Sequence, residues 1–267
     1  QQFYYPDSEA GRARYLADNE AILKRALAKQ GQFFGVQPKS EVVVRPVEKW
    51  REKSAAKAFY QNPPQDGSRP GVFYINLYDM KAAPKYQAAA ILFHEATPGH
   101  HVETAVAHEL TGVPSFRKFG GEAAFSEGWG LYAEGLADEM GLYEGPYDQF
   151  GRLTMSLMRA VRLVVDTGLH AKRWTRQQAL DYANANMPSS DYDNRREIER
   201  YIVLPGQATA YYIGKMKILE LRQRAQAALG ARFDIRAFHD AVLKSGPLPL
   251  PMLEESIDAW IAEQTHA

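Results

Sequence analysis

The 267-residue sequence contains no cysteine, so disulfide bonds and thiolate chemistry are excluded. Any transition metal would have to be held by His, Asp and Glu side chains. The charges also balance, with 32 Lys and Arg against 32 Asp and Glu. No overall field therefore favours nucleic acid or an anionic membrane surface, and we expect no nucleic-acid partner.

Long apolar stretches are missing as well. No run approaches the ~20 residues that a membrane-spanning helix needs, so we expect no transmembrane segment. The first residues, QQFYYPDSEAGRARY, have neither the basic nor the apolar region of a signal peptide. These absences do not fix the compartment, because a removed signal peptide would leave no trace.

Helical periodicity dominates what is present. Apolar residues at three- and four-residue steps from Tyr15 to Leu27 predict a long amphipathic helix that stops near Gly31. β-Branched and aromatic runs bounded by Pro and Gly predict strands within residues 41–50 and 71–79. Further helices are predicted over residues 85–97, 101–111, 121–139, 147–172, 175–186, 206–228, 233–245 and 251–264.

The predicted architecture is one domain, residues 1–267, which is mainly α with a small β-sheet. The strand-containing part covers about residues 40–80, and the helical part covers about residues 85–267. A chain of this length can bury a sizeable core and lies at the upper end of what one domain usually holds.

The segment ILFHEATPGHHVE, residues 91–103, comes close to the zinc-peptidase pattern His-Glu-x-x-His. His94 and Glu95 are present, but residue 98 is proline. In a straight helix His100 would lie ~9 Å along the axis from His94 and on the far side. Two imidazoles so placed cannot share one zinc ion, whose bonds to nitrogen are ~2.0–2.1 Å long.

Pro98 and Gly99 offer a solution, because proline disrupts a helix and glycine tolerates unusual backbone angles. A bulge over residues 97–99 would absorb two extra residues. His100 would then take the place of the second ligand, and Glu95 would face a metal-bound water. The alternative is a kinked polar helix whose histidines bind nothing.

A third ligand is expected from a separate downstream helix, as in zinc peptidases of the glutamate-ligand type. In FSEGWGLYAEGL, residues 125–136, Glu127 stands among bulky apolar residues, and a buried carboxylate needs a cation. Alternatively, Glu127 is a helix N-terminal glutamate stabilised by the macrodipole. Glu134, two turns along the same face, is either a partner of a ligand or exposed to solvent.

Another polar series lies in RAVRLVVDTGLH, residues 159–170. Arg162, Asp166 and His170 stand four residues apart on one helix face. If the series is buried, Asp166 would orient His170 as a donor to a developing oxyanion. The other interpretation is an exposed ladder of salt bridges.

Several long motifs in series resemble the bacterial family of unknown function DUF885, a group of predicted zinc metallopeptidases. They are HEATPGHHVE, FSEGWGLYAEGLADEMGLY, RLVVDTGLH, RYIVLPGQATAYYIGKMKILELR and FHDAVLKSGPLPLPMLEESI. The resemblance runs from about residue 70 to the C-terminus. It implies a gluzincin-like helical metallopeptidase catalytic domain with one Zn²⁺ per chain. Family members are longer and have an extra helical region before this part, and many look exported, which suggests the periplasm or cell envelope.

Matched by position, the resemblance implies His94, His100 and Glu127 as zinc ligands and Glu95 as the general base. Three further residues match ones that would donate hydrogen bonds to the oxyanion, namely His170, Tyr201 and Tyr211. His101, next to His100, would support the ligands without binding the zinc. Without the resemblance, most of the 15 tyrosines are simply packing residues.

The resulting hypothesis is zinc-dependent hydrolysis of peptide bonds, with a peptide as substrate. Arg200, beside Tyr201, would meet a substrate carboxylate or is a surface residue. The strand at residues 71–79 either has an exposed edge that would pair with an extended peptide or is an internal strand with no ligand role. The alternatives are a non-enzymatic helical binding module and a zinc hydrolase of non-peptide amides or esters.

Overall fold

The computed structural model describes residues 2–266 as a mainly helical protein with one small sheet. The α-helices are α1 Glu9–Gln30, α2 Lys85–Glu95, α3 His100–Glu109, α4 Ser115–Phe119, α5 Ala123–Glu139, α6 Pro146–His170, α7 Arg176–Asn186, α8 Asp191–Val203, α9 Gln207–Leu229, α10 Ile235–Lys244 and α11 Leu250–His266. Short 3₁₀ helices cover Met80–Ala82 and Gly230–Arg232. None of the helices in residues 2–266 has both the length and the apolar character needed to cross a bilayer.

The sheet has the strand order β1-β3-β2, formed by Val42–Pro46, Gly71–Ile75 and Ala58–Gln61. β3 pairs in parallel with β1 and antiparallel with β2, and all five of its residues are buried. Of the two interpretations of the strand at residues 71–79, the free edge is therefore wrong and the internal strand is confirmed. One outer edge of the sheet belongs to β2, a strand that the periodicity of the sequence did not predict.

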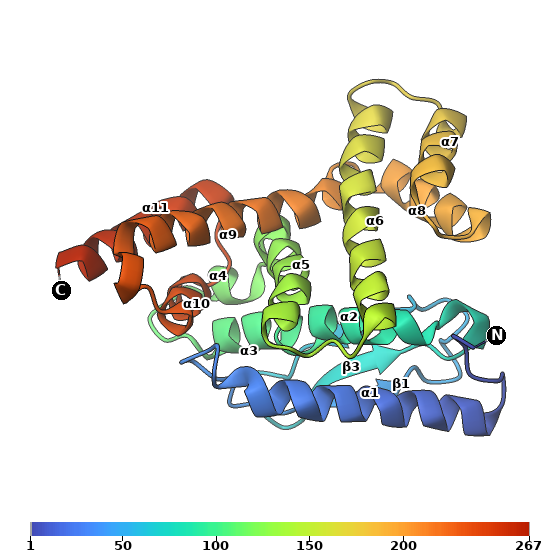
Figure 1. The fold of residues 1–267 in the computed structure, drawn as a ribbon, viewed down its shortest axis with the longest axis horizontal. Coiled ribbons are helices and arrows are strands. Elements are labelled where there is room, and N and C mark those ends of the chain that lie inside the picture. Colours follow the sequence, from blue (N-terminus) through green and yellow to red (C-terminus); the bar gives the residue numbers. More distant parts are fainter. Residues whose placement is uncertain (1, 267) are drawn as a thin grey trace.

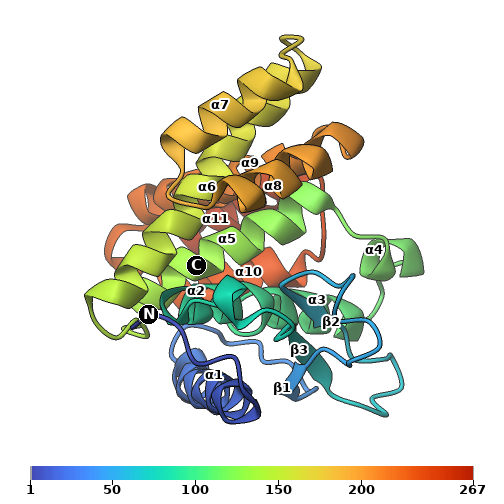
Figure 2. The same cartoon turned by 90° about the vertical axis from the view of Figure 1, so that its right-hand side faces the viewer.

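The helices surround this sheet in two tiers. α1 runs beneath the sheet and α2, while α2 and α3 follow one another along the middle of the molecule (Figure 1). α9 and α11 cross the upper side, and α6 stands across the end of α9 with α7 and α8 beyond it (Figure 1). Figure 2 shows α5 lying between α2 and α9. Segments from both halves of the sequence thus meet around α5.

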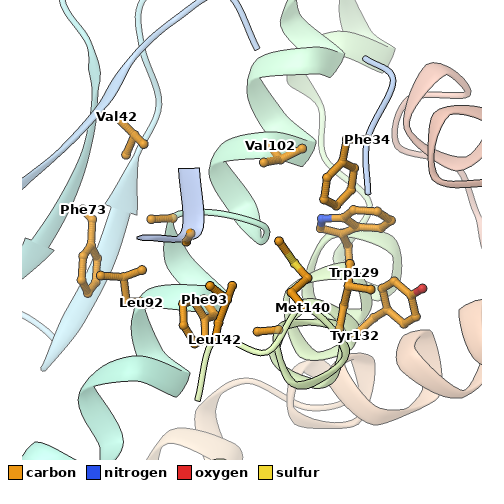
Figure 3. Packing of buried hydrophobic residues seen from close by; sticks show 14 of the residues in the cluster. Phe34, Val42, Phe73, Leu92, Phe93, Val102, Trp129, Tyr132, Met140 and Leu142 are labelled. Atoms are coloured by element: carbon orange, nitrogen blue, oxygen red, sulfur yellow. The ribbon is translucent and has the colours of Figure 1, made fainter. Parts of the chain in front are cut away.

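The main core lies where α2, α3 and α5 meet α1 and the sheet (Figure 3). Trp129, Phe34 and Phe93 are fully buried there. Trp129 packs edge-on against Phe34, with ring centroids 6.1 Å apart. At ~1.5–3 kcal/mol for each large side chain removed from water, this cluster fixes α5 firmly against α2.

α5 also approaches α9 more closely than ordinary side chains would allow. A methyl group on Gly128 would lie 2.5 Å from the Cα atom of Gly214. The two glycines therefore let the backbones of α5 and α9 touch. This contact sets the distance between the residues that the two helices present to the site.

The predicted helices are confirmed with small changes at their ends, and the helix predicted over residues 121–139 is α5. The short helix α4 and the longer α8 were not predicted. α8 buries only Asn194, Ile198 and Tyr201. These positions have helical spacing, but two of the three side chains are polar or amphipathic, so the apolar stripe is too sparse to identify from hydrophobicity alone.

Candidate metal centre

The chain breaks between α2 and α3, as the Pro-Gly pair predicts. α2 ends at Glu95 and α3 begins at His100. The indole N–H of Trp129 donates to the carbonyl of Pro98 at 3.0 Å and holds the connecting residues against α5. A methyl group on Gly99 would lie 1.9 Å from the carbonyl oxygen of His94, so only glycine permits this tight return.

The break brings His94, His100 and Glu127 together. One potential ligand atom from each lies within 4.8 Å of the other two. Glu127 Oε2 is 3.5 Å from His94 Nε2 and 3.5 Å from His100 Nε2. The imidazole rings meet nearly at right angles, at 87°, with centroids 4.7 Å apart.

These distances fit a shared cation better than direct contacts. Hydrogen bonds from nitrogen to oxygen are usually 2.7–3.2 Å long, and both separations exceed that range. Zinc bonds of about 2.0–2.2 Å at tetrahedral angles place neighbouring ligand atoms roughly 3.4 Å apart. Two imidazoles and one carboxylate also form a donor set that suits zinc and leaves one position open.

A buried carboxylate fixes the orientation of His94. Glu134, 2% exposed, lies 2.8 Å from His94 Nδ1, and Arg159 lies 3.2 Å from the same Glu134 oxygen. The carboxylate keeps the proton on Nδ1, so that the lone pair of Nε2 points toward Glu127 and His100. Glu134 is therefore the partner of His94, and it is not exposed to solvent.

The charges of His94, Glu127 and Glu134 are tightly coupled. Burial alone would lower the pKa of His94, but the adjacent carboxylates of Glu127 and Glu134 outweigh it and raise this pKa to about 9. Burial would raise the pKa of Glu127, yet the adjacent imidazoles of His100 and His94 hold it far below its usual range. A metal bound here would replace a proton on the imidazoles as the positive partner of Glu127.

Gly130, on α5, leaves space for the ring of His94. A methyl group at this position would lie 2.7–2.9 Å from three atoms of the imidazole ring. Gly130 stands between Glu127 and Glu134 on the helix face that points at the site. The helix can therefore present both Glu127 and Glu134 while leaving space between them for the His94 ring.

Glu95 directly follows His94 as the last residue of α2 and is half-buried. Within residues 2–266 its carboxylate has no hydrogen bond or ion pair to another side chain. It is therefore available to accept a proton from a ligand or a water molecule.

Tyr211 and Gln207, from α9, complete the rim of the site. The Tyr211 ring stacks beside His94 at 6.1 Å, and its hydroxyl accepts hydrogen bonds from Gln207 Nε2 and from Arg200, both at 3.2 Å. Gln207 Nε2 also donates to Glu127 Oε1 at 3.3 Å. Because the Tyr211 hydroxyl accepts twice, its own hydrogen has no acceptor among the described residues.

Tyr201 lies further from the His-His-Glu cluster than Tyr211 does. Its hydroxyl donates to Glu197 at 2.7 Å and accepts from Arg162 at 3.1 Å, while Arg162 forms an ion pair with Glu197 at 2.7 Å. The Arg162 guanidinium covers the Tyr211 ring at 4.7 Å from its centroid. The hydroxyl hydrogen of Tyr201 is thus already donated to Glu197, and Tyr201 supports Tyr211 by holding Arg162 in place.

The expected Asp166–His170 pair does not form. Both oxygens of buried Asp166 accept from the backbone N–H of Gly206 at 3.1 Å, at the start of α9. His170 is exposed, and its Nε2 lies 2.9 Å from the carbonyl oxygen of Tyr201. The exposed ladder is equally wrong, because Arg162 and Asp166 are 4% and 3% exposed. The series instead ties α6 to the segment joining α8 and α9.

His101 points away from the cluster. Its Nδ1 lies 2.8 Å from the hydroxyl of Tyr60 on β2, and burial lowers its pKa to about 4. It therefore connects α3 to the sheet. The buried carboxylate nearest the ligands on α3 is Glu103, which accepts from Ser126 at 3.1 Å, and burial raises its pKa although the charge of His100 opposes the shift.

A cavity of about 370 Å³ lies between the sheet, α2 and α8, and its lining does not include His94, His100 or Glu127. It is lined by Ile91, one turn before Glu95 on α2, and by Arg196, one turn before Arg200 on α8. Beside it, Lys57, the residue before β2, forms an ion pair with Asp193 on α8 at 2.8 Å. The two helices that supply Glu95 and Arg200 thus also form walls of a space large enough for a ligand.

Sequence reasoning missed several residues of this site, including Arg159, Gln207, Gly130 and Glu103. Arg159 extends the Arg162–Asp166 stripe by one turn, so a longer search along that face would have found it. Gly130 could have been found as the residue without a side chain between Glu127 and Glu134. No local signal marks Gln207, because its role depends on the contact between α5 and α9.

Fold and site together define a mainly helical protein with a small mixed sheet and a His-His-Glu cluster of metal-ligand geometry. Residues 1–257 match DUF885, described as bacterial protein of unknown function, and the chain belongs to this family. No curated protein matches the chain.

Two solved structures share the fold. One, described as "the putative lipoprotein from Colwellia psychrerythraea", is 42% identical with a TM-score of 0.95 over 98% of this chain. The other, described as "a putative lipoprotein of unknown function from Shewanella oneidensis", is 20% identical with a TM-score of 0.77 over 90% of this chain. This chain spans 45% of the length of each.

Proposed function

We propose that the protein is a zinc-dependent hydrolase of peptide bonds, with the chemistry of the gluzincin class. The observation that supports this most is the convergence of His94 Nε2, His100 Nε2 and Glu127 Oε2 at spacings typical of a zinc site. Glu95, next to the first ligand, supplies a free carboxylate. This combination is what hydrolysis by activated water requires.

Zinc bound by this set would polarise the scissile carbonyl and lower the pKa of a water molecule towards about 7. Glu95 accepts a proton from the attacking water as the new C–O bond forms. When the C–N bond breaks, Glu95 returns this proton to the leaving amine. The second proton of the water stays on the new hydroxyl and then passes from the resulting carboxylic acid to the amine, so the products are a carboxylate and an ammonium group.

Tyr211 is the proposed donor to the oxyanion. Its hydroxyl accepts from Arg200 and Gln207, which leaves its hydrogen directed at neither of them. A donor held in place before the reaction avoids the cost of reorganisation when charge develops. Tyr201, whose hydroxyl is bonded to Glu197 and Arg162, and His170, whose Nε2 contacts the Tyr201 carbonyl, are proposed as positioning residues for this donor and for α8.

The substrate is proposed to lie between α2 and α8, where Ile91 and Arg196 line the cavity one helical turn before Glu95 and Arg200. The free edge of β2 offers backbone groups to an extended peptide on the same side of the molecule. Both solved relatives are described as putative lipoproteins, which supports an exported location, in the periplasm or at the cell envelope.

Incubation of the zinc-loaded protein with a peptide library, and with acylated small-molecule amides and esters, tests the proposal. We expect peptide cleavage that Glu95→Gln abolishes while zinc stays bound, and that Glu20→Gln, an exposed change on α1, leaves intact. Cleavage restricted to small-molecule amides or esters contradicts the peptide assignment. Zinc binding without any hydrolysis contradicts the enzyme assignment and favours a binding module.

A further inference from the structure

Three arginines surround the candidate metal centre, and two of them are neutralised. Arg159 forms an ion pair with Glu134, and Arg162 forms one with Glu197. Both guanidinium groups are buried, with the residues 5% and 4% exposed. They balance charges inside the protein and are not accessible to a ligand.

Arg200 differs from both. Its contacts are neutral, namely Gln207 Oε1 at 3.0 Å and the Tyr211 hydroxyl at 3.2 Å. No carboxylate among residues 2–266 lies within ion-pair distance of it. Arg200 is half-buried, and both contacts use the same nitrogen, so its other N–H groups remain available to a ligand.

Arg200 also lies at a defined separation from the metal ligands. The Gln207 amide accepts from Arg200 with its oxygen and donates to Glu127 with its nitrogen. One amide group therefore separates the guanidinium from a ligand of the proposed zinc. In a peptide, the terminal carboxylate lies one residue, roughly 3.5 Å, beyond the last amide carbonyl. A substrate with its last amide at the metal would bring its carboxylate near Arg200.

We propose that Arg200 binds the α-carboxylate of the substrate's C-terminal residue, so that the protein acts as a carboxypeptidase. This inference rests on the proposed function. A guanidinium held by Gln207 and Tyr211 can form two parallel hydrogen bonds to a carboxylate. Water adds across the last C–N bond, and the products are one free amino acid and a peptide shortened by one residue.

The test uses two N-acetylated peptides of the same sequence, one with a free C-terminal carboxylate and the other with a carboxamide. N-acetylation removes the amino terminus as an alternative anchor. We expect kcat/KM to be about 10- to 150-fold higher for the acid, the range given by a hydrogen bond to a charged group. Arg200→Gln should remove this preference, whereas Arg195→Gln, an exposed change on the same helix, should preserve it.

Binding to zinc-loaded Glu95→Gln, measured by calorimetry, separates this inference from the proposed hydrolysis. Tighter binding of the acid that depends on Arg200 supports the carboxylate site even if neither peptide is cleaved. Equal cleavage and equal binding of acid and amide overturn the inference and leave the hydrolase proposal standing. An equal loss of turnover on both peptides in Arg200→Gln, with binding unchanged, also overturns it, because Arg200 would then act at the reacting carbonyl.

Discussion

Gly130→Ala should weaken the metal centre although residue 130 is not a ligand. The added methyl group would lie 2.7–2.9 Å from three ring atoms of His94, whereas ordinary contacts begin at about 3.5 Å. The ring would have to move by roughly 0.6–0.8 Å. His94 is 4% exposed and is held by Glu134, so it has no free space behind it.

A shift of that size exceeds the ~0.2 Å by which metal–ligand distances usually vary. We expect zinc affinity to fall by about 10- to 100-fold, as for other changes that misalign a ligand. Overpacking should also destabilise the fold by about 1–3 kcal/mol. Gly135→Ala is the matched control on α5, because nothing lies within 4 Å of its added methyl group, and it should gain up to ~1 kcal/mol from helix propensity.

The assay is zinc calorimetry together with thermal unfolding of the metal-free proteins. The difference between the two alanine variants isolates the clash, since both replace a glycine within the same helix. If Gly130→Ala binds zinc as tightly as Gly135→Ala, then His94 is not confined as the structure indicates. The reasoning on how α5 shapes the site would be refuted.

Two further predictions concern Tyr211 and His239. Tyr211→Phe should reduce kcat by about 10²–10³ with zinc still bound, and Tyr212→Phe should not; equal turnover in the two variants would contradict an oxyanion role. Burial lowers the pKa of His239 to about 4, below the ~6.5 of an unfolded chain. Its ring accepts from Tyr132 and lies 2.8 Å from the Phe33 carbonyl, as a neutral imidazole does. As the pH falls below 6.5, the unfolded chain binds a proton at this histidine before the folded protein does. The contribution of neutral His239 to the free energy of unfolding is therefore complete above pH 6.5 and should decrease, by roughly 3 kcal/mol, as the pH falls to 4. Denaturant unfolding should show a smaller acid loss for His239→Gln, and an identical loss would disprove the assignment.

Much of the site could be predicted because its decisive features are local. Pro98 and Gly99 prevent a straight helix whatever surrounds them, and the structure confirms the predicted break. The same break explains how two histidines six residues apart can share one point in space. Glu127 could be proposed because its apolar neighbours predict an inward face.

The remaining features depend on contacts between helices that a sequence does not describe. Asp166 and His170 share a helix face, but α8 and α9 offer each of them a closer partner. The hydrogen bond from Gln207 to Glu127 exists only because Gly128 and Gly214 allow α5 and α9 to touch. Such partners become predictable once the helix packing is known.

The central claim is that His94, His100 and Glu127 hold one zinc ion together. An anomalous-scattering map recorded at the zinc edge, from crystals of the zinc-loaded protein, tests it most directly. The account predicts one peak within about 2.0–2.2 Å of His94 Nε2, His100 Nε2 and a Glu127 oxygen. A zinc peak bound by other residues, or no peak between these three side chains, would contradict it.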